Sequence, residues 1–225
     1  METEEIDRYT ICPYVPRECS MFTSYQRSPI YPTIPFRCII FGPSGSGKTT
    51  FISSMLSGQC EALYCQYDLY TGMGLECGDY NTPGYPTMNS PYQITKPPKG
   101  CNGQLQHCIN IIDDPNLSDK YLRDYLTNVY KKSRHYGQSQ ILCLHSLEDL
   151  NKSGLSTVIN NCNMIVMTRQ ATESYGGNAR RLVNLMGSSQ ASSQMLSLAN
   201  SDNENDRYCV LNKANNQVSF ISSEY

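Results

Sequence analysis

The segment Gly42-Pro-Ser-Gly-Ser-Gly-Lys48-Thr49 carries the residue types that bind phosphate groups. Its glycines leave backbone N–H groups uncovered, so that these groups can face phosphate oxygens at the start of a helix. The ammonium of Lys48 can reach the β- and γ-phosphates of a nucleoside triphosphate, and the Thr49 hydroxyl is placed to coordinate Mg²⁺. A chance loop of glycine and serine is the alternative. With ATP and Mg²⁺ as ligands, the expected contacts are Gly42, Pro43, Ser44, Gly45, Ser46, Gly47, Lys48, Thr49 and Thr50.

Two adjacent carboxylates, Asp113 and Asp114, end the apolar run CINII and precede Pro115. Successive side chains of a strand point to opposite faces, so the two residues should have different roles if the strand geometry persists. Asp113 is the expected Mg²⁺ partner, and Asp114 is the candidate to orient or deprotonate an attacking water. The alternative is that the pair only caps the helix that follows.

Three further polar residues are candidates for the same chemistry. His145 lies at the carboxyl end of an expected strand, where it could sense the γ-phosphate or the attacking water, and Ser146 is an equal candidate. Arg134 lies just before that strand, where an arginine can reach a neighbouring subunit's site and offset charge on a transferred phosphoryl group. The alternatives are that His145 simply ends the strand and that Arg134 is a surface charge.

The elements that must position these residues alternate between strands and helices. Apolar runs predict strands at 36–41, 62–66, 108–112, 141–145 and 164–168. Apolar periodicity predicts helices at 49–58, at 116–133 with Ser118 as N-cap, at 147–161 and at 180–186. This alternation predicts one α/β domain of the P-loop NTPase type, with a mainly parallel sheet flanked by helices. The active site is then expected at the carboxyl ends of the strands.

The remaining segments are less regular. Residues 1–33 contain Pro13, Pro16, Pro29 and Pro32, which favour an extended N-terminal arm and leave 34–225 as the ATPase domain. Residues 67–103 are rich in Gly, Pro, Tyr and Asn and predict a long surface insertion. The C-terminal run RYCVLNKANNQVSFI predicts a β-hairpin at an edge of the sheet.

The composition narrows the functional class. The formal net charge is −2, so no general excess of Lys and Arg indicates nucleic-acid binding. Contact with DNA would need local patches, at Lys131, Lys132 and Arg134 or at Arg180 and Arg181, although a solvated helix face is the plainer interpretation. The 11 cysteines include no CxxC pair and follow no leader sequence, which favours reduced thiols inside the cell and no zinc site. No apolar run is long enough to predict a membrane span.

Four segments together resemble the small genome-packaging ATPases of the FtsK/HerA class, found in poxvirus-like large DNA viruses, polinton-type elements and virophages. The segments are FRCIIFGPSGSGKTTF, CINIIDDP, SRHYGQSQILCLHS and NNCNMIVM. The selective features are the paired aspartates, the Arg134–His135 pair and the Asn-Cys run before the fifth strand. The chain departs from the family at the end of the fourth strand, where such ATPases usually carry glutamine and this chain has His145 and Ser146.

The resemblance implies a homo-oligomeric ring that uses ATP hydrolysis to drive double-stranded DNA into a preformed capsid, docked on a capsid or portal component. By motif, Lys48 and Thr49 match the phosphate and Mg²⁺ residues, Asp113 and Asp114 the second acidic motif, and Arg134 the trans-acting arginine. The implied location is intracellular, at the virus assembly site of a host cell, or in the virion. A helicase-like translocase, a small-molecule kinase and a nucleotide-dependent switch protein remain the alternatives.

Overall fold

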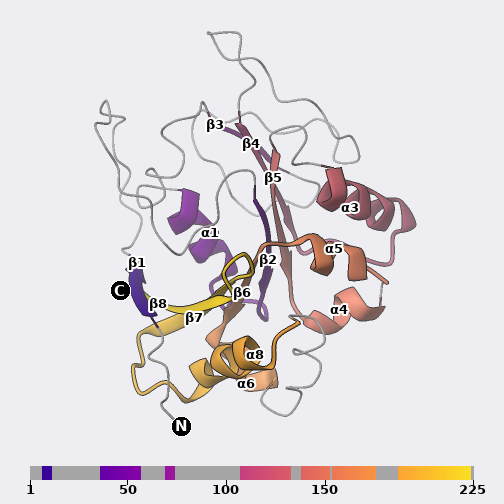
Figure 1. Ribbon diagram of the computed structural model, residues 1–225. Helices are drawn as coiled ribbons and strands as arrows, with labels where there is room; N and C mark the ends of the chain where they lie inside the picture. Colours follow the sequence, from indigo (N-terminus) through magenta and orange to yellow (C-terminus); the bar gives the residue numbers. More distant parts are fainter. Residues whose placement is uncertain are drawn as a thin grey trace.

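A sheet of eight strands runs through the described part of the protein, and helices cover both of its faces (Figure 1). The computed structural model describes residues 7–11, 36–56, 69–73, 107–132, 138–152, 154–175 and 187–223. The strands are β1 (Asp7–Ile11), β2 (Arg37–Phe41), β3 (Leu69–Met73), β4 (His107–Asp113), β5 (Gln138–Leu144), β6 (Met164–Thr168), β7 (Asp206–Asn212) and β8 (Gln217–Ser223). The helices are α1 (Lys48–Leu56), α3 (Lys120–Lys132), α4 (Leu147–Lys152), α5 (Ser156–Asn161), α6 (Arg169–Tyr175), α8 (Ser189–Leu196) and the 3₁₀ helix η2 (Ser197–Asn200). The fold class is α/β, as predicted.

The strand order is β1-β8-β7-β6-β2-β5-β4-β3. β2 pairs in parallel with β5 on one side and with β6 on the other, and β4 pairs in parallel with β5 and β3. β1 is parallel to β8, whereas β7 is antiparallel to both β6 and β8. The described sheet is therefore mainly parallel, and the carboxyl ends of β2, β4, β5 and β6 lie along one end of it. β5 separates β2 from β4.

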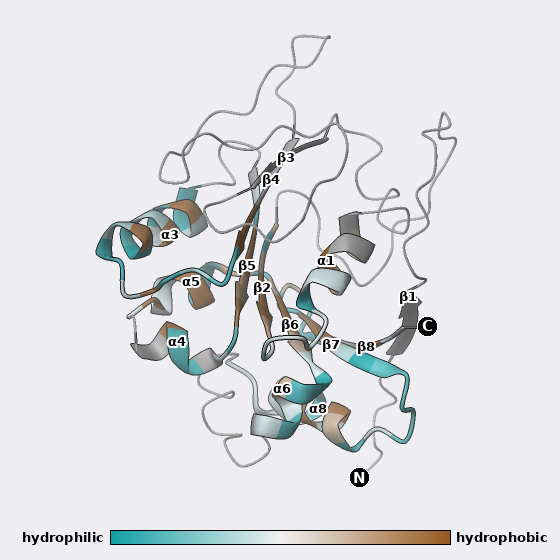
Figure 2. Ribbon diagram, turned by 180° about the vertical axis from the view of Figure 1, so that it is seen from behind, coloured by the Kyte–Doolittle hydropathy of each residue, from teal (hydrophilic) through white to brown (hydrophobic). Residues whose placement is uncertain are grey.

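Two apolar clusters fill the space on the two faces of this sheet. On one face, Phe51, Ile52 and Met55 of α1 pack against β2, β5, β6 and β7. On the other face, α3, α4, α5, α6 and α8 supply buried residues. Neighbouring residues of β5 divide between the clusters, Cys143 facing α1 and Leu144 facing the opposite layer, because side chains alternate along a strand. In Figure 2 the central strands are hydrophobic, and hydrophilic residues mark α3, α4 and α6.

The expected helix over 147–161 is wrong, because the chain forms two short helices there, α4 and α5. Gly154 lies between them with a φ of 72°, a conformation that favours glycine. The Leu155 N–H donates to the Leu150 carbonyl oxygen at 3.0 Å, the bond that closes a helix around a left-handed residue. The glycine therefore ends α4 and lets the chain turn before α5 begins.

The expected start of the next helix upstream is also corrected. α3 begins at Lys120, and its N-cap is Asp119 instead of Ser118. The Asp119 carboxylate accepts a hydrogen bond from the Tyr121 N–H at 2.8 Å, and its carbonyl accepts one from the Arg123 N–H at 3.1 Å. Residues 114–119 thus form the connection between β4 and α3.

The structure adds strands and helices within the terminal and irregular segments. Part of the expected arm, residues 7–11, forms β1 beside β8, so the β7–β8 pair does not lie at the edge of the sheet. Part of the expected insertion, residues 69–73, forms β3 beside β4. α6 and α8 form where no helix was predicted. The strand expected at 62–66 and the helix expected at 180–186 lie outside the described residues.

Candidate functional site

The loop of residues 42–47, here called the glycine loop, joins the carboxyl end of β2 to the start of α1. The Gly42 N–H donates to the Leu144 carbonyl oxygen at 3.0 Å, which ties the loop to β5. The Ser46 N–H donates to the Pro43 carbonyl oxygen at 3.2 Å and closes the loop on itself. Gly45 and Gly47 have φ angles of 74° and 93°, which side chains rarely tolerate. The glycines are therefore required by the backbone path.

Close packing explains why residue 42, at the start of the glycine loop, is a glycine. A Cβ at Gly42 would collide with the side chains of Ser46 and Thr168. Thr168 ends β6, and its hydroxyl oxygen accepts a hydrogen bond from the Ala171 N–H at 3.3 Å. The start of the loop therefore rests on β6.

Lys48 is buried at the first residue of α1, with 7% of its surface exposed. Its Nζ donates to the carbonyl oxygens of Gly42 at 2.8 Å and Pro43 at 3.2 Å, so the ammonium lies across the glycine loop. Thr49 and Thr50 follow and are exposed. The first turn of α1 contains no acidic residue, so the positive end of the helix dipole at the loop is not offset locally. Phosphate oxygens fit this cradle of N–H groups, positive helix end and ammonium.

The acidic residues lie two strands away from the loop. Asp113 ends β4 and is half-buried; it pairs in register with Cys143 of β5, which pairs in turn with Ile40 of β2. Two strand spacings amount to about 10 Å. Burial raises the pKa of the Cys143 thiol well above 9.0, the Asp113 charge raises it further, and the Lys48 charge lowers it. The strand register therefore places Asp113 at the same end of the sheet as the glycine loop, which leads into Lys48.

Asp114 does not continue the strand. Its φ of 45° takes the backbone out of the extended conformation, so the expected alternation of Asp113 and Asp114 across the sheet does not hold. The Asp114 Oδ2 atom lies 3.1 Å from His145 Nε2, and the two side chains are 44% and 48% exposed. We call Asp113, Asp114 and His145 the acidic edge.

The structure separates the two equal candidates at the end of β5. His145 faces Asp114, whereas Ser146 caps α4. The Ser146 hydroxyl oxygen accepts a hydrogen bond from the Glu148 N–H at 3.0 Å, and Asp149 Oδ2 accepts one from the Ser146 N–H at 3.1 Å. Of the two, His145 is the side chain that lies at the acidic edge.

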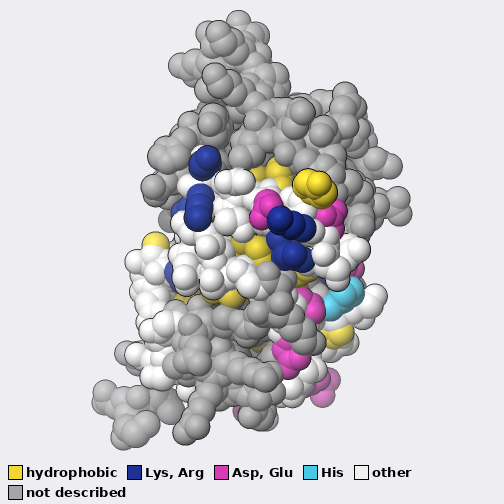
Figure 3. Space-filling view, turned by 90° about the vertical axis from the view of Figure 1, so that its right-hand side faces the viewer, with side chains coloured by type: hydrophobic (Ala, Val, Ile, Leu, Met, Phe, Trp, Pro, Cys, Tyr) yellow, Lys and Arg dark blue, Asp and Glu magenta, His cyan; other side chains and the backbone are white. Residues whose placement is uncertain are grey.

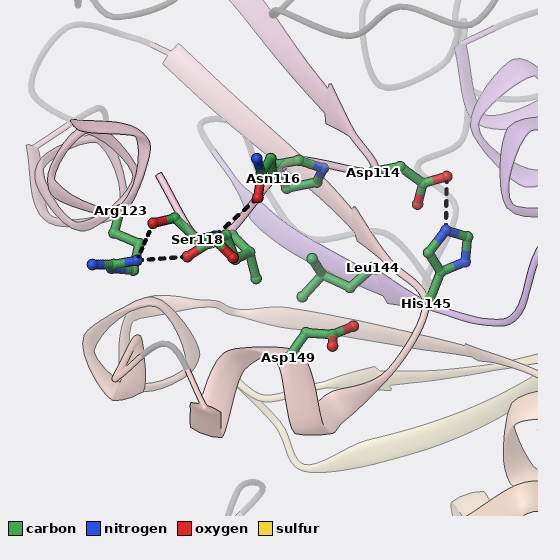
Figure 4. Close-up of a pocket in the computed structure, with 9 residues that line it drawn as sticks. Asp114, Asn116, Ser118, Arg123, Leu144, His145 and Asp149 are labelled. Atoms are coloured by element: carbon green, nitrogen blue, oxygen red, sulfur yellow. Dashed lines mark hydrogen bonds and ion pairs between the residues drawn. The ribbon is translucent and has the colours of Figure 1, made fainter. Parts of the chain in front are cut away.

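A cavity of about 550 Å³ opens beside Asp114 and His145, between the start of α3 and the start of α4. Figure 4 shows the Asp114–His145 pair at one side of the cavity, Arg123 and Ser118 at the other, and Leu144 and Asp149 between them. The Arg123 Nη1 atom donates to the Leu117 and Ser118 carbonyl oxygens at 2.7 and 2.9 Å. The volume is that of a small-molecule site.

A magnesium ion would find few protein ligands here. Among the described residues, no group of three or more His, Cys, Asp or Glu side chains is arranged to hold a metal ion. Mg²⁺ commonly takes one or two protein oxygens together with phosphate oxygens and water, so Thr49 and Asp113 fit that donor set only in the presence of a phosphate ligand.

Other residues singled out in the sequence have different outcomes. Arg134, Arg180 and Arg181 lie outside the described residues. The Asn-Cys run before β6 has a structural role in which Asn163 Oδ1 accepts a hydrogen bond from the Arg37 N–H at 2.7 Å. Tyr208, which the sequence did not single out, donates its hydroxyl proton to the Gly47 carbonyl oxygen at 3.0 Å.

The outer face of α3 carries both signs of charge. In Figure 3, Lys and Arg side chains lie beside Asp and Glu side chains on this side of the molecule. The exposed residues of α3 include Tyr121, 78% exposed, and the basic pair Lys131 and Lys132 at its end. The part of this face that the structure describes is therefore no continuous basic strip. No helix in the described ranges has the length and hydropathy needed to cross a membrane.

Comparisons with known proteins add only a weak structural match to this geometry. No protein-family model matches the chain, and no curated protein matches it. A solved structure that resembles it weakly is the X-ray structure of the Legionella pneumophila ATPase DotB, with a TM-score of 0.37 and 12% sequence identity. The aligned part covers 61% of this chain and 41% of the DotB chain, so the chain spans less than half of that protein's length.

Proposed function

We propose that the chain is a P-loop ATPase that binds Mg-ATP at the glycine loop and hydrolyses it. One observation carries the proposal: the loop with Lys48 and the acidic edge lie at the carboxyl ends of β2, β5 and β4, which are neighbours in the sheet. A terminal phosphate held by Lys48 would point toward a carboxylate two strands away, as phosphoryl transfer to water requires.

The side chains divide the work by position. Lys48 and the loop N–H groups hold the phosphates, and Thr49 and Asp113 are the side chains that would hold Mg²⁺, which supplies charge neutralisation when bound. Asp114 is the candidate to orient the attacking water, and His145, whose Nε2 atom lies 3.1 Å from the Asp114 carboxylate, positions that carboxylate by donating a hydrogen bond to it.

We further propose that hydrolysis drives double-stranded DNA into a viral capsid, by a homo-oligomeric ring of this chain. The support is the resemblance of four sequence segments to packaging ATPases of the FtsK/HerA class. In such a ring, Arg134 of one subunit would reach the acidic edge of the next. The half-exposed state of Asp114 and His145 suits a site that a neighbour completes.

The experiment measures phosphate release from Mg-ATP, with and without double-stranded DNA, for the wild type and Lys48→Ala. We expect Mg²⁺-dependent release that DNA stimulates and that the variant lacks. Oligomeric state is measured in parallel with ATP and DNA. Absence of hydrolysis under all conditions contradicts the proposal of an ATPase. Hydrolysis by a protein that stays monomeric and is not stimulated by DNA contradicts the proposal of a DNA motor, but not that of an ATPase.

The cavity beside Asp114 favours one second candidate, a small-molecule kinase. A space of about 550 Å³ next to the acidic edge could hold a phosphoryl acceptor in place of water. The products decide between the two: ADP with free phosphate supports the ATPase, and ADP with a phosphorylated acceptor supports the kinase.

A further inference from the structure

Tyr208 of β7 contacts the end of the glycine loop at Gly47. Its hydroxyl donates to the Gly47 carbonyl oxygen at 3.0 Å, and its side chain is buried. The same carbonyl accepts the first hydrogen bond of α1, from the Phe51 N–H at 2.9 Å. The Tyr208 ring lies against the Phe51 ring, with centroids 5.1 Å apart and planes tilted by 55°. Two hydrogen-bond donors therefore hold the carbonyl end of the peptide that joins Gly47 to Lys48.

This hold fixes the direction of the opposite end of the peptide. In a trans peptide the carbonyl and the N–H point in opposite directions. Because the Gly47 carbonyl points toward the Tyr208 hydroxyl and the Phe51 N–H, the Lys48 N–H points away from both of these donors. That N–H is one of the donors expected to face a phosphate oxygen.

Neighbouring residues fix Tyr208 in place. Thr168 of β6 pairs in register with Tyr208 of β7. A Cβ on Gly42 would collide with Thr168, and a Cβ on Gly47 with Tyr208, so these two paired residues support the two ends of the glycine loop. The register of β7 shifts between Asp206 and Tyr208, and such a bulge re-aims the side chain beside it. Asp206 is itself fully buried and accepts hydrogen bonds from Ser201, Asn203 and Ser222.

Gly47 leaves room for this contact. A Cβ there would lie 2.6 Å from the Tyr208 hydroxyl oxygen, so the close approach depends on the missing side chain. We propose that Tyr208 is a positioning residue of the nucleotide site, whose hydroxyl orients the Gly47–Lys48 peptide toward the phosphates. The inference rests on the proposed function and assigns the antiparallel strand β7 a part in nucleotide binding.

The test compares Tyr208→Phe with Tyr130→Phe, measuring KM and kcat for Mg-ATP and the melting temperature. Tyr130 is a matched control, because it is also fully buried and its hydroxyl donates to a backbone carbonyl, that of Cys38, at 2.7 Å. Tyr130 belongs to α3, on the other face of the sheet from α1. Both variants lose one hydroxyl bond, and both should melt at a lower temperature.

We expect KM to rise about fivefold in Tyr208→Phe, the effect of one ordinary hydrogen bond, with kcat within about twofold of the wild type. Tyr130→Phe should leave KM within about twofold. An unchanged KM in Tyr208→Phe, or an equal rise in both variants, overturns the inference while the ATPase stands. A wild type that does not bind Mg-ATP overturns the inference and the proposed function together.

A second measurement applies if Tyr208→Phe does not fold. Hydrogen exchange of the wild type is compared with and without Mg-ATP in two segments, residues 207–211 of β7 and 217–221 of β8. We expect Mg-ATP to slow exchange more in β7, since β7 contacts the loop through Tyr208. Equal slowing in the two strands overturns the inference.

Discussion

The glycine loop and the acidic edge lie along the same end of the sheet, but they are built differently. Lys48 is buried and bonded to two carbonyl oxygens of its own loop, and the loop is supported from β5, β6 and β7. Asp114 and His145 are about half exposed and paired with each other. The first region is rigidly packed, whereas the second is open to solvent.

Under the proposed function, this difference separates nucleotide binding from turnover. A loop whose backbone is fixed before a ligand arrives presents its donors without further ordering, which favours affinity. An exposed carboxylate–histidine pair exchanges partners with water easily, which suits a group that must act on a water molecule. Substitutions in the two regions should therefore differ in kind as well as in size.

The largest effect is expected from Lys48→Ala. The change removes the ammonium that is proposed to reach the phosphates and leaves the Gly42 and Pro43 carbonyls without its hydrogen bonds. Charge-assisted bonds of this kind contribute about 3 kcal/mol, so Mg-ATP should bind at least about 100-fold more weakly, with no measurable turnover. Calorimetric titration checks the affinity. Binding at wild-type strength would remove the loop from the nucleotide site.

Asp114→Asn should affect turnover and spare binding. The amide keeps the shape of the side chain and loses the charge that is proposed to orient water, so kcat should fall about 10²–10⁴-fold. The affinity for Mg-ATP should stay within a few-fold of the wild type, since Lys48 and the loop are unchanged. Equal losses of binding in Lys48→Ala and Asp114→Asn would contradict the division between the two regions.

Two glycine substitutions measure how tightly the loop is packed. Gly47 and Gly154 both have positive φ angles, of 93° and 72°, but only Gly47 has Tyr208 within 4 Å of the added Cβ. Gly154→Ala should cost about 1 kcal/mol in the free energy of unfolding and leave nucleotide affinity unchanged. Gly47→Ala should cost more and weaken Mg-ATP binding as well. Urea unfolding and nucleotide titration give both quantities; similar behaviour of the two variants would mean that the loop is not tightly packed.

The last effect is a pH dependence at Cys143, which pairs in register with Asp113 on one side and Ile40 on the other. Because burial raises its pKa above the ordinary 9.0, the thiol stays protonated in the folded chain while the unfolded chain ionises. Its contribution is complete below pH 9 and is lost as the pH rises, by about 1.4 kcal/mol between about pH 8 and pH 10. Cys143→Ala should lose less stability over this interval than the wild type. An identical loss would mean that the thiol ionises equally in both states.

Much of the central sheet could be predicted from the sequence. Buried parallel strands are continuous apolar runs, and for this reason the sequence predicts the strands that contain Ile40, Ile111 and Val166. The shared location of Lys48 and Asp113 followed from the rule that parallel strands end at one edge. Local signals carry this information.

The remaining features depend on contacts between distant residues or on local signals that fit more than one structure. The bond from Tyr208 to Gly47 spans 161 positions, and no local pattern indicates it. Gly154 interrupts the helical spacing of apolar residues in the sequence. Such a glycine is compatible both with one continuous helix and with the end of a helix, and here it ends one. The cap at Asp119 competed with an equally suitable Ser118 one residue earlier, and only the folded geometry separates them.

The pairing of β1 with β8 has a practical consequence for measuring subunit assembly. Residues 7–11 cover the backbone of β8, which would otherwise present a row of unsatisfied N–H and carbonyl groups at the margin of the sheet. Shortening the chain to begin at residue 34 would uncover that strand and invite two copies to join side by side. Such dimers would form independently of nucleotide, so subunit assembly should be measured with a protein that retains residues 1–33.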